Sequence, residues 1–306
     1  MARQIGTLRG WVEWAGIALP WAILRALPLE RAVRLGAAAG SIAMAIDRRN
    51  RSIAMRNLAI AFPEIGEAAR LAILRDTYRN FGRMAAEWVH LYEFNPGNIE
   101  RYVTYTGREH WDEAIRLSAG RGILVLTGHF GNFELLSVGH SIHGNRAAIV
   151  QRPNRNPVID RAVAARRLRN GNLTISRKGA GREILRLLRQ NWMVGVALDL
   201  DVRHGVFVDF FSLKASTSDA LARVAIATRA PVLPMFMVRE GTSTRHRITF
   251  LPPIQAVRGA DRDETVRSYT QQFTGLIESI VRRHPDHWNW IHRRWKTRPP
   301  GEPRFY

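Results

Sequence analysis

The alternation of short apolar runs with helical stretches constrains the fold of this chain more than any other feature of its sequence. The apolar runs are 123–126, 147–150, 173–175, 194–198 and 232–238, and the helical stretches between them are 133–140, 157–168, 182–188 and 218–228. Strands that alternate with helices favour a largely parallel sheet with helices on both faces. We therefore predict an α/β fold with a mixed, largely parallel sheet flanked by helices.

Both ends of the chain extend this pattern. Apolar residues at helical spacing predict helices over 50–95, with breaks at prolines and glycines, and one long helix over 263–283. Residues 247–251 are expected to return against 235–239 as a hairpin. We predict two parts, an N-terminal helical region over residues 1–50 and an α/β domain over residues 51–306.

Two uncharged runs, 14–24 and 35–46, mark the N-terminal region. Each is shorter than the roughly 20 apolar residues that a membrane-spanning helix needs. Arginines flank both runs, and Trp11, Trp14 and Trp21 lie alongside. Tryptophan beside basic residues is typical of a membrane interface with anionic lipid. We predict a membrane-associated helical region, either peripheral or with one N-terminal anchor; the alternative is a buried helical hairpin with a solvated basic edge.

The charge of the chain indicates an anionic partner. Its 46 Lys and Arg residues against 26 Asp and Glu residues give a formal net charge of +20. Such a field attracts nucleic acid, acidic lipid or an acidic carrier protein. The basic residues are scattered along the chain and form no known nucleic-acid module, although a nucleic-acid-binding protein remains the alternative from a different class. The absence of cysteine excludes a disulfide scaffold, a Cys-ligated zinc site and a thiol nucleophile.

The segment 123–136, ILVLTGHFGNFELL, carries the clearest chemical signal. Its apolar strand predicts that His129 lies in the turn at the carboxyl end of a strand, where open α/β sheets bind their ligands. A helix that starts near Gly131 or Asn132 would offer free N–H groups to a developing oxyanion. Glu134, in the first turn of that helix, could hold one imidazole nitrogen and leave the other to accept a proton. The alternative is a helix-capping turn with an incidental histidine.

His-x4-Glu after a strand resembles the lipid A biosynthesis acyltransferases, the late-acting lauroyl and myristoyl transferases, which are relatives of the glycerolipid acyltransferases. The other segments that carry the resemblance are Arg56-Asn57-Leu58 with Pro63, Arg152-Pro153 with Asn156-Pro157 and Asp160, Asp199-x-Asp201, residues 205–211, and residues 290–299. They span residues 50–300 in the order of the family. Leu200 and Gln151 depart from the usual pattern, and these departures concern the acceptor and the acyl chain more than the reaction type.

The resemblance implies transfer of a fatty acyl chain from an acyl carrier protein thioester to a hydroxyl of a lipid A precursor. His129 would act as general base and Glu134 would orient it. Acceptors other than lipid A precursors, such as another glycolipid or an aminolipid, and acyl-CoA as the donor stay open. The resemblance also implies a location on the cytoplasmic face of the inner membrane.

Further residues are candidates for substrate binding, each with a structural alternative. Arg152 has a guanidinium suited to phosphate, and otherwise it is a surface arginine before a proline turn. Asp199 and Asp201 would orient Arg152 or another basic group, or cap a strand end. Asn156 either binds substrate, together with Asp160, or caps the helix after it. The basic segment His292, Arg293 and Arg294 would grip phosphates of a lipid or the acidic carrier, or form a solvated helix end.

No cofactor or metal is expected. His140-x-x-His143 and His284-x-x-His287 have a spacing that can ligate a metal, but neither pair has a recognisable third ligand. Gly179-Ala-Gly181 lacks the third glycine of a dinucleotide-binding turn. The chain also has no Gly-x-Ser-x-Gly nucleophile elbow, which argues against a serine hydrolase.

Overall fold

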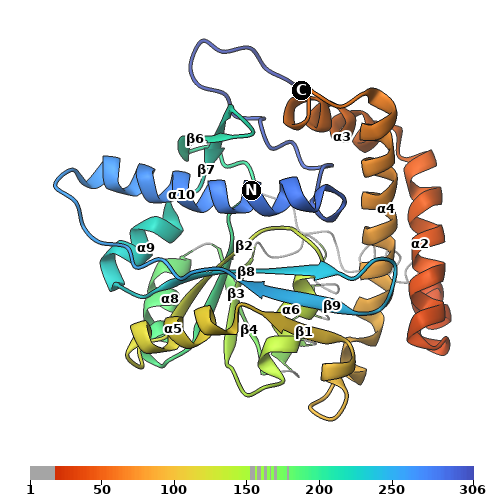
Figure 1. Ribbon diagram of the computed structural model, residues 1–306, viewed down its shortest axis with the longest axis horizontal. Coiled ribbons are helices and arrows are strands. Elements are labelled where there is room, and N and C mark those ends of the chain that lie inside the picture. Colours follow the sequence, from red (N-terminus) through yellow and green to blue (C-terminus); the bar gives the residue numbers. More distant parts are fainter. Residues whose placement is uncertain are drawn as a thin grey trace.

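The computed structural model describes residues 18–151, 156, 160–161, 164–165, 167–168, 171–177 and 179–306 (Figure 1). The strands are β1 Val103–Thr106, β2 Ile123–Thr127, β3 Ala147–Gln151, β4 Leu173–Ser176, β5 Met193–Ala197, β6 Val206–Phe210, β7 Leu213–Thr217, β8 Val232–Arg239 and β9 His246–Phe250. The α-helices are α2 Leu29–Ile46, α3 Arg48–Ala61, α4 Glu67–His90, α5 Arg108–Ser118, α6 Phe133–Ser141, α8 Ala180–Arg189, α9 Ala220–Thr228 and α10 Arg262–Arg283. Short 3-10 helices cover Leu91–Glu93, Ile99–Arg101 and Pro285–His287.

Seven strands form one mixed sheet in the order β1-β9-β8-β2-β5-β3-β4. All neighbouring strands pair in parallel except β8 and β9, which form an antiparallel hairpin with Met235 opposite Phe250. Strands β6 and β7 form a separate antiparallel pair. The sheet confirms the predicted α/β class and the predicted hairpin between residues 235–239 and 247–251.

Alternation along the strands produces two apolar cores, one on each face of the sheet. Leu124 and Leu126 of β2 point to one face and pack with residues of α8, α9 and α10. Ile123 and Val125 point to the other face and pack with residues of α5, α6, α4 and α2. Helices therefore cover both faces, as expected for a largely parallel sheet.

The N-terminal helices stand at one side of the sheet, where α2 and α4 run alongside each other (Figure 1). Helix α2 buries Ala32, Val33 and Gly36 on one side, whereas Leu35 and Ile42 are exposed on the other. Residues 18–26 are also helical. Within the part of the chain that the structure describes, no helix has both the length and the apolar character to cross a membrane. The predicted division at residue 50 falls inside α3 and stays a prediction.

Three elements were not predicted from the sequence. Strand β1 and helix α5 precede the alternating segment. The β6–β7 hairpin lies between the predicted strand over 194–198 and the predicted helix over 218–228. Phe211 and Ser212 make the tight turn of this hairpin with positive φ angles of 51° and 58°. Of the predicted helix over 157–168, residues 160–161, 164–165 and 167–168 are described, and all of them are helical.

Candidate active site

His129 follows the central strand β2, two residues after its last residue, Thr127. Strand β5 is the parallel neighbour of β2, and the two run together to their carboxyl ends, where Thr127 is paired with Ala197. The backbone N–H of Leu198 donates to the Thr127 carbonyl at 3.1 Å. Because the carboxyl ends of parallel strands meet at one edge of the sheet, Asp199 comes to lie beside His129.

Asp199 holds His129 through both carboxylate oxygens. Oδ1 lies 2.8 Å from the imidazole Nδ1, and Oδ2 accepts the backbone N–H of His129 at 2.7 Å. Trp288 donates its indole N–H to the same Oδ2 at 2.8 Å. A carboxylate only accepts hydrogen bonds, so Nδ1 carries the proton and Nε2 is left as the basic nitrogen.

The surroundings of this pair set its protonation. Burial disfavours the imidazolium, but the charge and hydrogen bond of Asp199, with a smaller contribution from Glu134, outweigh burial and raise the pKa of His129 above its ordinary value. Burial likewise opposes ionisation of Asp199, yet His129 and the Trp288 hydrogen bond lower the pKa of this carboxyl to about 2. Asp199 is therefore a buried anion that stabilises a protonated His129.

The start of α6 is shaped by Gly131. Its φ of +56° is left-handed, and a Cβ atom there would lie 1.9 Å from the Met237 carbonyl oxygen. The N–H of Gly131 donates to the carbonyl of His287 at 2.8 Å. The N–H of Gly131 is therefore already hydrogen-bonded within the fold and is not free for an oxyanion, whereas the prediction for the other N–H groups at the start of α6 stays a prediction.

The prediction that Glu134 holds the imidazole is also wrong. Arg167 binds both carboxylate oxygens of Glu134, at 3.0 Å from Nε to Oε2 and by a second contact from Nη2 to Oε1. The Glu134 and Arg167 side chains are nearly buried, with 13% and 8% of their surface exposed. Arg167 also donates to the side chain of Gln151. Glu134 acts on His129 through its charge, and Asp199 supplies the hydrogen bond that the sequence suggested for Glu134.

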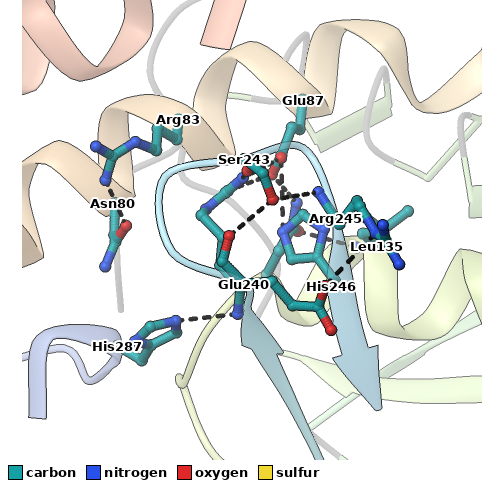
Figure 2. Close-up of polar contacts among 11 residues, drawn as sticks. Asn80, Arg83, Glu87, Leu135, Glu240, Ser243, Arg245, His246 and His287 are labelled. Atoms are coloured by element: carbon teal, nitrogen blue, oxygen red, sulfur yellow. Dashed lines mark hydrogen bonds and ion pairs between the residues drawn. The ribbon is translucent and has the colours of Figure 1, made fainter. Parts of the chain in front are cut away.

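A buried polar network fixes the start of α6 from the side of α4. Glu87, which is 1% exposed, accepts two hydrogen bonds from the Arg239 guanidinium at 2.5 and 2.6 Å and one from Asn132 at 2.7 Å. The Asn132 side-chain oxygen in turn caps α6 by accepting the N–H of Leu135 at 3.0 Å. Figure 2 shows Glu87 beside His246, whose pKa burial lowers to about 4. The network ties α4 and the β8–β9 hairpin to the helix that follows His129.

A cavity of about 800 Å³ opens beside His129. Its lining is mainly apolar, and it also includes Glu134, Arg167, Asp201 and His292. An apolar cavity with a few converging polar groups is the usual form of a small-molecule site. The size of the cavity suits a long apolar substrate. His129 lines the cavity, and Nε2 is its basic nitrogen because Nδ1 is held by Asp199.

Arg294 and His292 of the C-terminal basic segment are structural, which corrects the prediction that they grip phosphates, and for Arg293 that role stays a prediction. Arg294 is fully buried, donates to Ser216 and Thr217 at 2.9 and 2.5 Å, and has its pKa lowered by burial to about 10. His292 accepts the backbone N–H of Asp201 at 2.9 Å, and burial lowers its pKa to about 4, so it is neutral at pH 7. Arg293 lies over the ring of Tyr306 at 5.9 Å.

The remaining candidates divide between structural roles and the undescribed part of the chain. Asp201 accepts the N–H and hydroxyl of Thr297 at 2.9 and 3.0 Å, as a loop cap does. Asn156 is buried, and its carbonyl accepts the N–H of Asp160 at 2.9 Å, which agrees with the start of a helical turn. Arg152 lies outside the described residues, and its predicted role in phosphate binding stays a prediction.

Neither histidine pair that the sequence singled out forms a metal site among the residues that the structure describes. His140 packs edge-on against Trp111 at 4.5 Å between ring centroids, and burial lowers its pKa to about 3. Both ring nitrogens of His287 are hydrogen-bonded. Nδ1 lies 2.9 Å from a carboxylate oxygen of Asp286, and Nε2 accepts the backbone N–H of Arg239 at 3.0 Å. Over the described ranges, no group of three or more potential ligands comes together.

Comparison with known proteins identifies the family. Residues 2–297 match the family described as bacterial lipid A biosynthesis acyltransferase. The lipid A biosynthesis lauroyltransferase of Escherichia coli K12 is 29% identical over 97% of this chain and 95% of its own length. The lipid A biosynthesis myristoyltransferase of the same organism is 28% identical over 97% of this chain and 91% of its own length. The crystal structure of the 1-acyl-sn-glycerophosphate acyltransferase of Thermotoga maritima matches 76% of this chain and 97% of its own, with 15% sequence identity and a TM-score of 0.35. The chain is therefore an acyltransferase and belongs to the bacterial lipid A biosynthesis acyltransferase family.

Proposed function

We propose that this enzyme transfers a fatty acyl chain from an acyl carrier protein thioester to a hydroxyl of a lipid A precursor, with His129 as general base. The observation that carries the proposal is the pairing of His129 with the buried Asp199 carboxylate at the wall of the apolar cavity. The family membership supports the reaction class, and the geometry supports the role of each residue.

The proton moves through one nitrogen. Nδ1 of His129 donates to Asp199, so Nε2 accepts the proton of the acceptor hydroxyl as its oxygen attacks the thioester carbonyl carbon. The carbon–sulfur bond then breaks and the carrier leaves as a thiolate, which takes the proton back from Nε2 and regenerates the neutral imidazole. Asp199 stabilises the imidazolium between these two steps. A base of this kind contributes about 10²–10⁴-fold in rate.

The ion pair of Glu134 and Arg167 has a second role in this scheme. Both residues line the cavity beside His129. The charge of Glu134 contributes to the raised pKa of His129, and the bidentate contact holds the Arg167 guanidinium in place. We infer that the pair sets the polarity of the site at the reacting end of the acyl chain.

The charge of the enzyme fits both proposed partners. A net charge of +20 attracts an acidic acyl carrier protein and an anionic membrane surface. We propose that the N-terminal helices hold the enzyme on the cytoplasmic face of the inner membrane, where the acceptor lipid is. Support comes from large apolar side chains that these helices expose: Leu19 at 69%, Ile42 at 62% and Ile46 at 74%.

Removal of residues 1–30 tests the membrane proposal. The shortened enzyme is expected to leave the membrane fraction, because the first uncharged run and its tryptophans are gone. A triple substitution of Leu19, Ile42 and Ile46 by Ser tests the exposed face with the chain length preserved. Unchanged sedimentation of both variants with membranes would rule out this attachment.

Mass spectrometry tests the reaction itself. A lipid A precursor incubated with purified enzyme and a panel of acyl carrier protein thioesters is expected to gain the mass of one acyl group. The His129→Ala enzyme is expected to give no product above background. Transfer only from acyl-CoA, or only to another glycolipid or aminolipid, would replace the proposed donor or acceptor, and transfer to none of them would refute the proposal.

A further inference from the structure

The cavity draws its walls from both faces of the sheet, although a continuous sheet separates its two faces. Leu136, Met193 and Met235 line it and belong to the core beneath α6. Ile184, Leu221 and Val224 also line it, and they pack in the core beneath α8, α9 and α10. We name the first part, defined by Leu136, Met193 and Met235, the α6-face chamber. The second part, defined by Ile184, Leu221 and Val224, is the α9-face chamber.

The two chambers meet where the sheet divides. Pairing between β3 and β5 ends at Ile149 and Gly195. Beyond that point β3 stays with β4 as far as Gln151, and β5 stays with β2 as far as Ala197. The carboxyl ends of β3 and β5 are therefore not joined, and this opening lies at the edge of the sheet that carries His129. Residues from both sides of the opening line the cavity, including Ile149, Val150 and Val196.

Gly195 and Val196 are adjacent on β5 and face opposite chambers. The side-chain direction of Gly195 matches that of Met193, in the α6-face chamber, and Val196 packs in the opposite core. A Cβ atom on Gly195 would meet only the Ala148 carbonyl within 4 Å, at 3.8 Å. Glycine is disfavoured inside a strand, so its position here is best explained by the space that it leaves. From Met193 to Ala197 the strand rises roughly 13 Å, a depth that suits an alkyl chain.

The geometry points to a site for two alkyl chains at once, one on each face of the sheet, with their reacting ends meeting at His129. The inference rests on the proposed function, because acyl transfer between a thioester and a lipid brings together two substrates that each carry an apolar chain. One chamber receives the chain of the acyl donor and the other receives a chain of the acceptor lipid. Each chain is held mainly by burial of its methylene groups.

Blocking each chamber separately tests this inference. Gly195→Val narrows the α6-face chamber with a side chain that strands favour, and Val196→Phe narrows the α9-face chamber from the next residue of the same strand. Val257→Phe is the matched control, because Val257 is 65% exposed and does not line the cavity. Thermal unfolding of all the full-length variants establishes that they fold; Val224→Phe replaces Val196→Phe if the latter does not.

Binding of laurate gives a readout that does not depend on turnover. The number of bound laurate molecules is measured by calorimetry. The wild type and the Val257→Phe control are expected to bind one laurate more than either chamber variant. They are expected to bind two more than the double variant, which carries both chamber substitutions. Equal stoichiometry in the wild type and either chamber variant would overturn the inference. This outcome is distinct from failure of the proposed function, which would show as laurate binding without acyl transfer to any lipid A precursor.

Kinetics then separate the two chains. One chamber variant is expected to shift donor preference towards shorter acyl chains, by about tenfold or more per methylene. The other is expected to raise KM for the acceptor by a similar factor and leave the donor preference as in the control. If both variants change only the donor preference, the cavity holds the donor chain alone and the inference is wrong.

Discussion

The carboxylate of Asp199 lies so close to Gly128 that a Cβ atom at position 128 would be 3.0 Å from its Oδ2 oxygen. That oxygen is the one that accepts the His129 N–H and the Trp288 indole N–H. Glycine in the turn after β2 therefore leaves room for the contact between Asp199 and His129, two residues that lie 70 positions apart in the sequence.

Replacement of Gly128 by Ala is expected to lower kcat by up to about 10²-fold, because a small displacement of Asp199 misplaces the imidazole. Steady-state kinetics with a thermal unfolding control measure this effect. Retention of full activity in a folded Gly128→Ala enzyme would show that the close approach is not needed.

His129→Ala and Glu134→Ala are expected to differ in stability. His129→Ala removes the base and lowers turnover by about 10²–10⁴-fold, and the protein stays folded because Asp199 keeps the hydrogen bonds from the backbone N–H of residue 129 and from the Trp288 indole. Glu134→Ala also leaves the nearly buried Arg167 without its partner, so it lowers both activity and the free energy of unfolding, the latter by about 3–5 kcal/mol. Equal unfolding midpoints for the two variants would count against the ion pair.

Glu87→Ala is expected to destabilise the protein by about 3–5 kcal/mol, because it strands the buried Arg239 guanidinium and frees the Asn132 cap of α6. Glu264→Ala is the matched control. Its partner Arg267 forms an exposed pair on α10, at 2.7 Å, worth about 0–1 kcal/mol. Denaturant unfolding of both variants makes the comparison, and similar losses would contradict a structural role for Glu87.

His140 is expected to make the protein sensitive to acid. Burial lowers its folded-state pKa to about 3, whereas the unfolded chain titrates near 6.5. The unfolded state therefore binds more protons below that pH, so this contribution to stability is complete above about pH 6.5 and is lost as the pH falls towards 3. His140→Gln should flatten the acid side of a plot of unfolding free energy against pH, and an unchanged slope would exclude His140 as its source.

The sequence predicted those parts of the fold and site that depend on local pattern. The turn that carries His129 was found because an apolar strand, Gly128 and a helix start follow one another within a few residues. Strands β1, β6 and β7 are short and gain their order from pairing, so their periodicity carried little signal.

Partners distant in sequence were harder to predict. Glu134 was chosen as the partner of His129 because it is near in sequence, whereas Asp199 reaches the imidazole only because β5 pairs with β2. Arg294 looked like part of a solvated basic run, but its planar guanidinium finds acceptors at the end of β7 and is buried. The role of Arg167 had no signal in the sequence, because its contact with Glu134 is a tertiary one.

The pH dependence of kcat/KM tests most directly whether Asp199 tunes His129 as a general base. The wild-type rate is expected to fall on the acid side with an apparent pKa above 6.5, because protonated His129 cannot accept the hydroxyl proton. Asp199→Asn removes the charge that opposes burial, so the acid limb should move to lower pH while the plateau drops by about 10²–10⁴-fold. An acid limb and plateau that stay at their wild-type values in a folded Asp199→Asn enzyme would contradict the account.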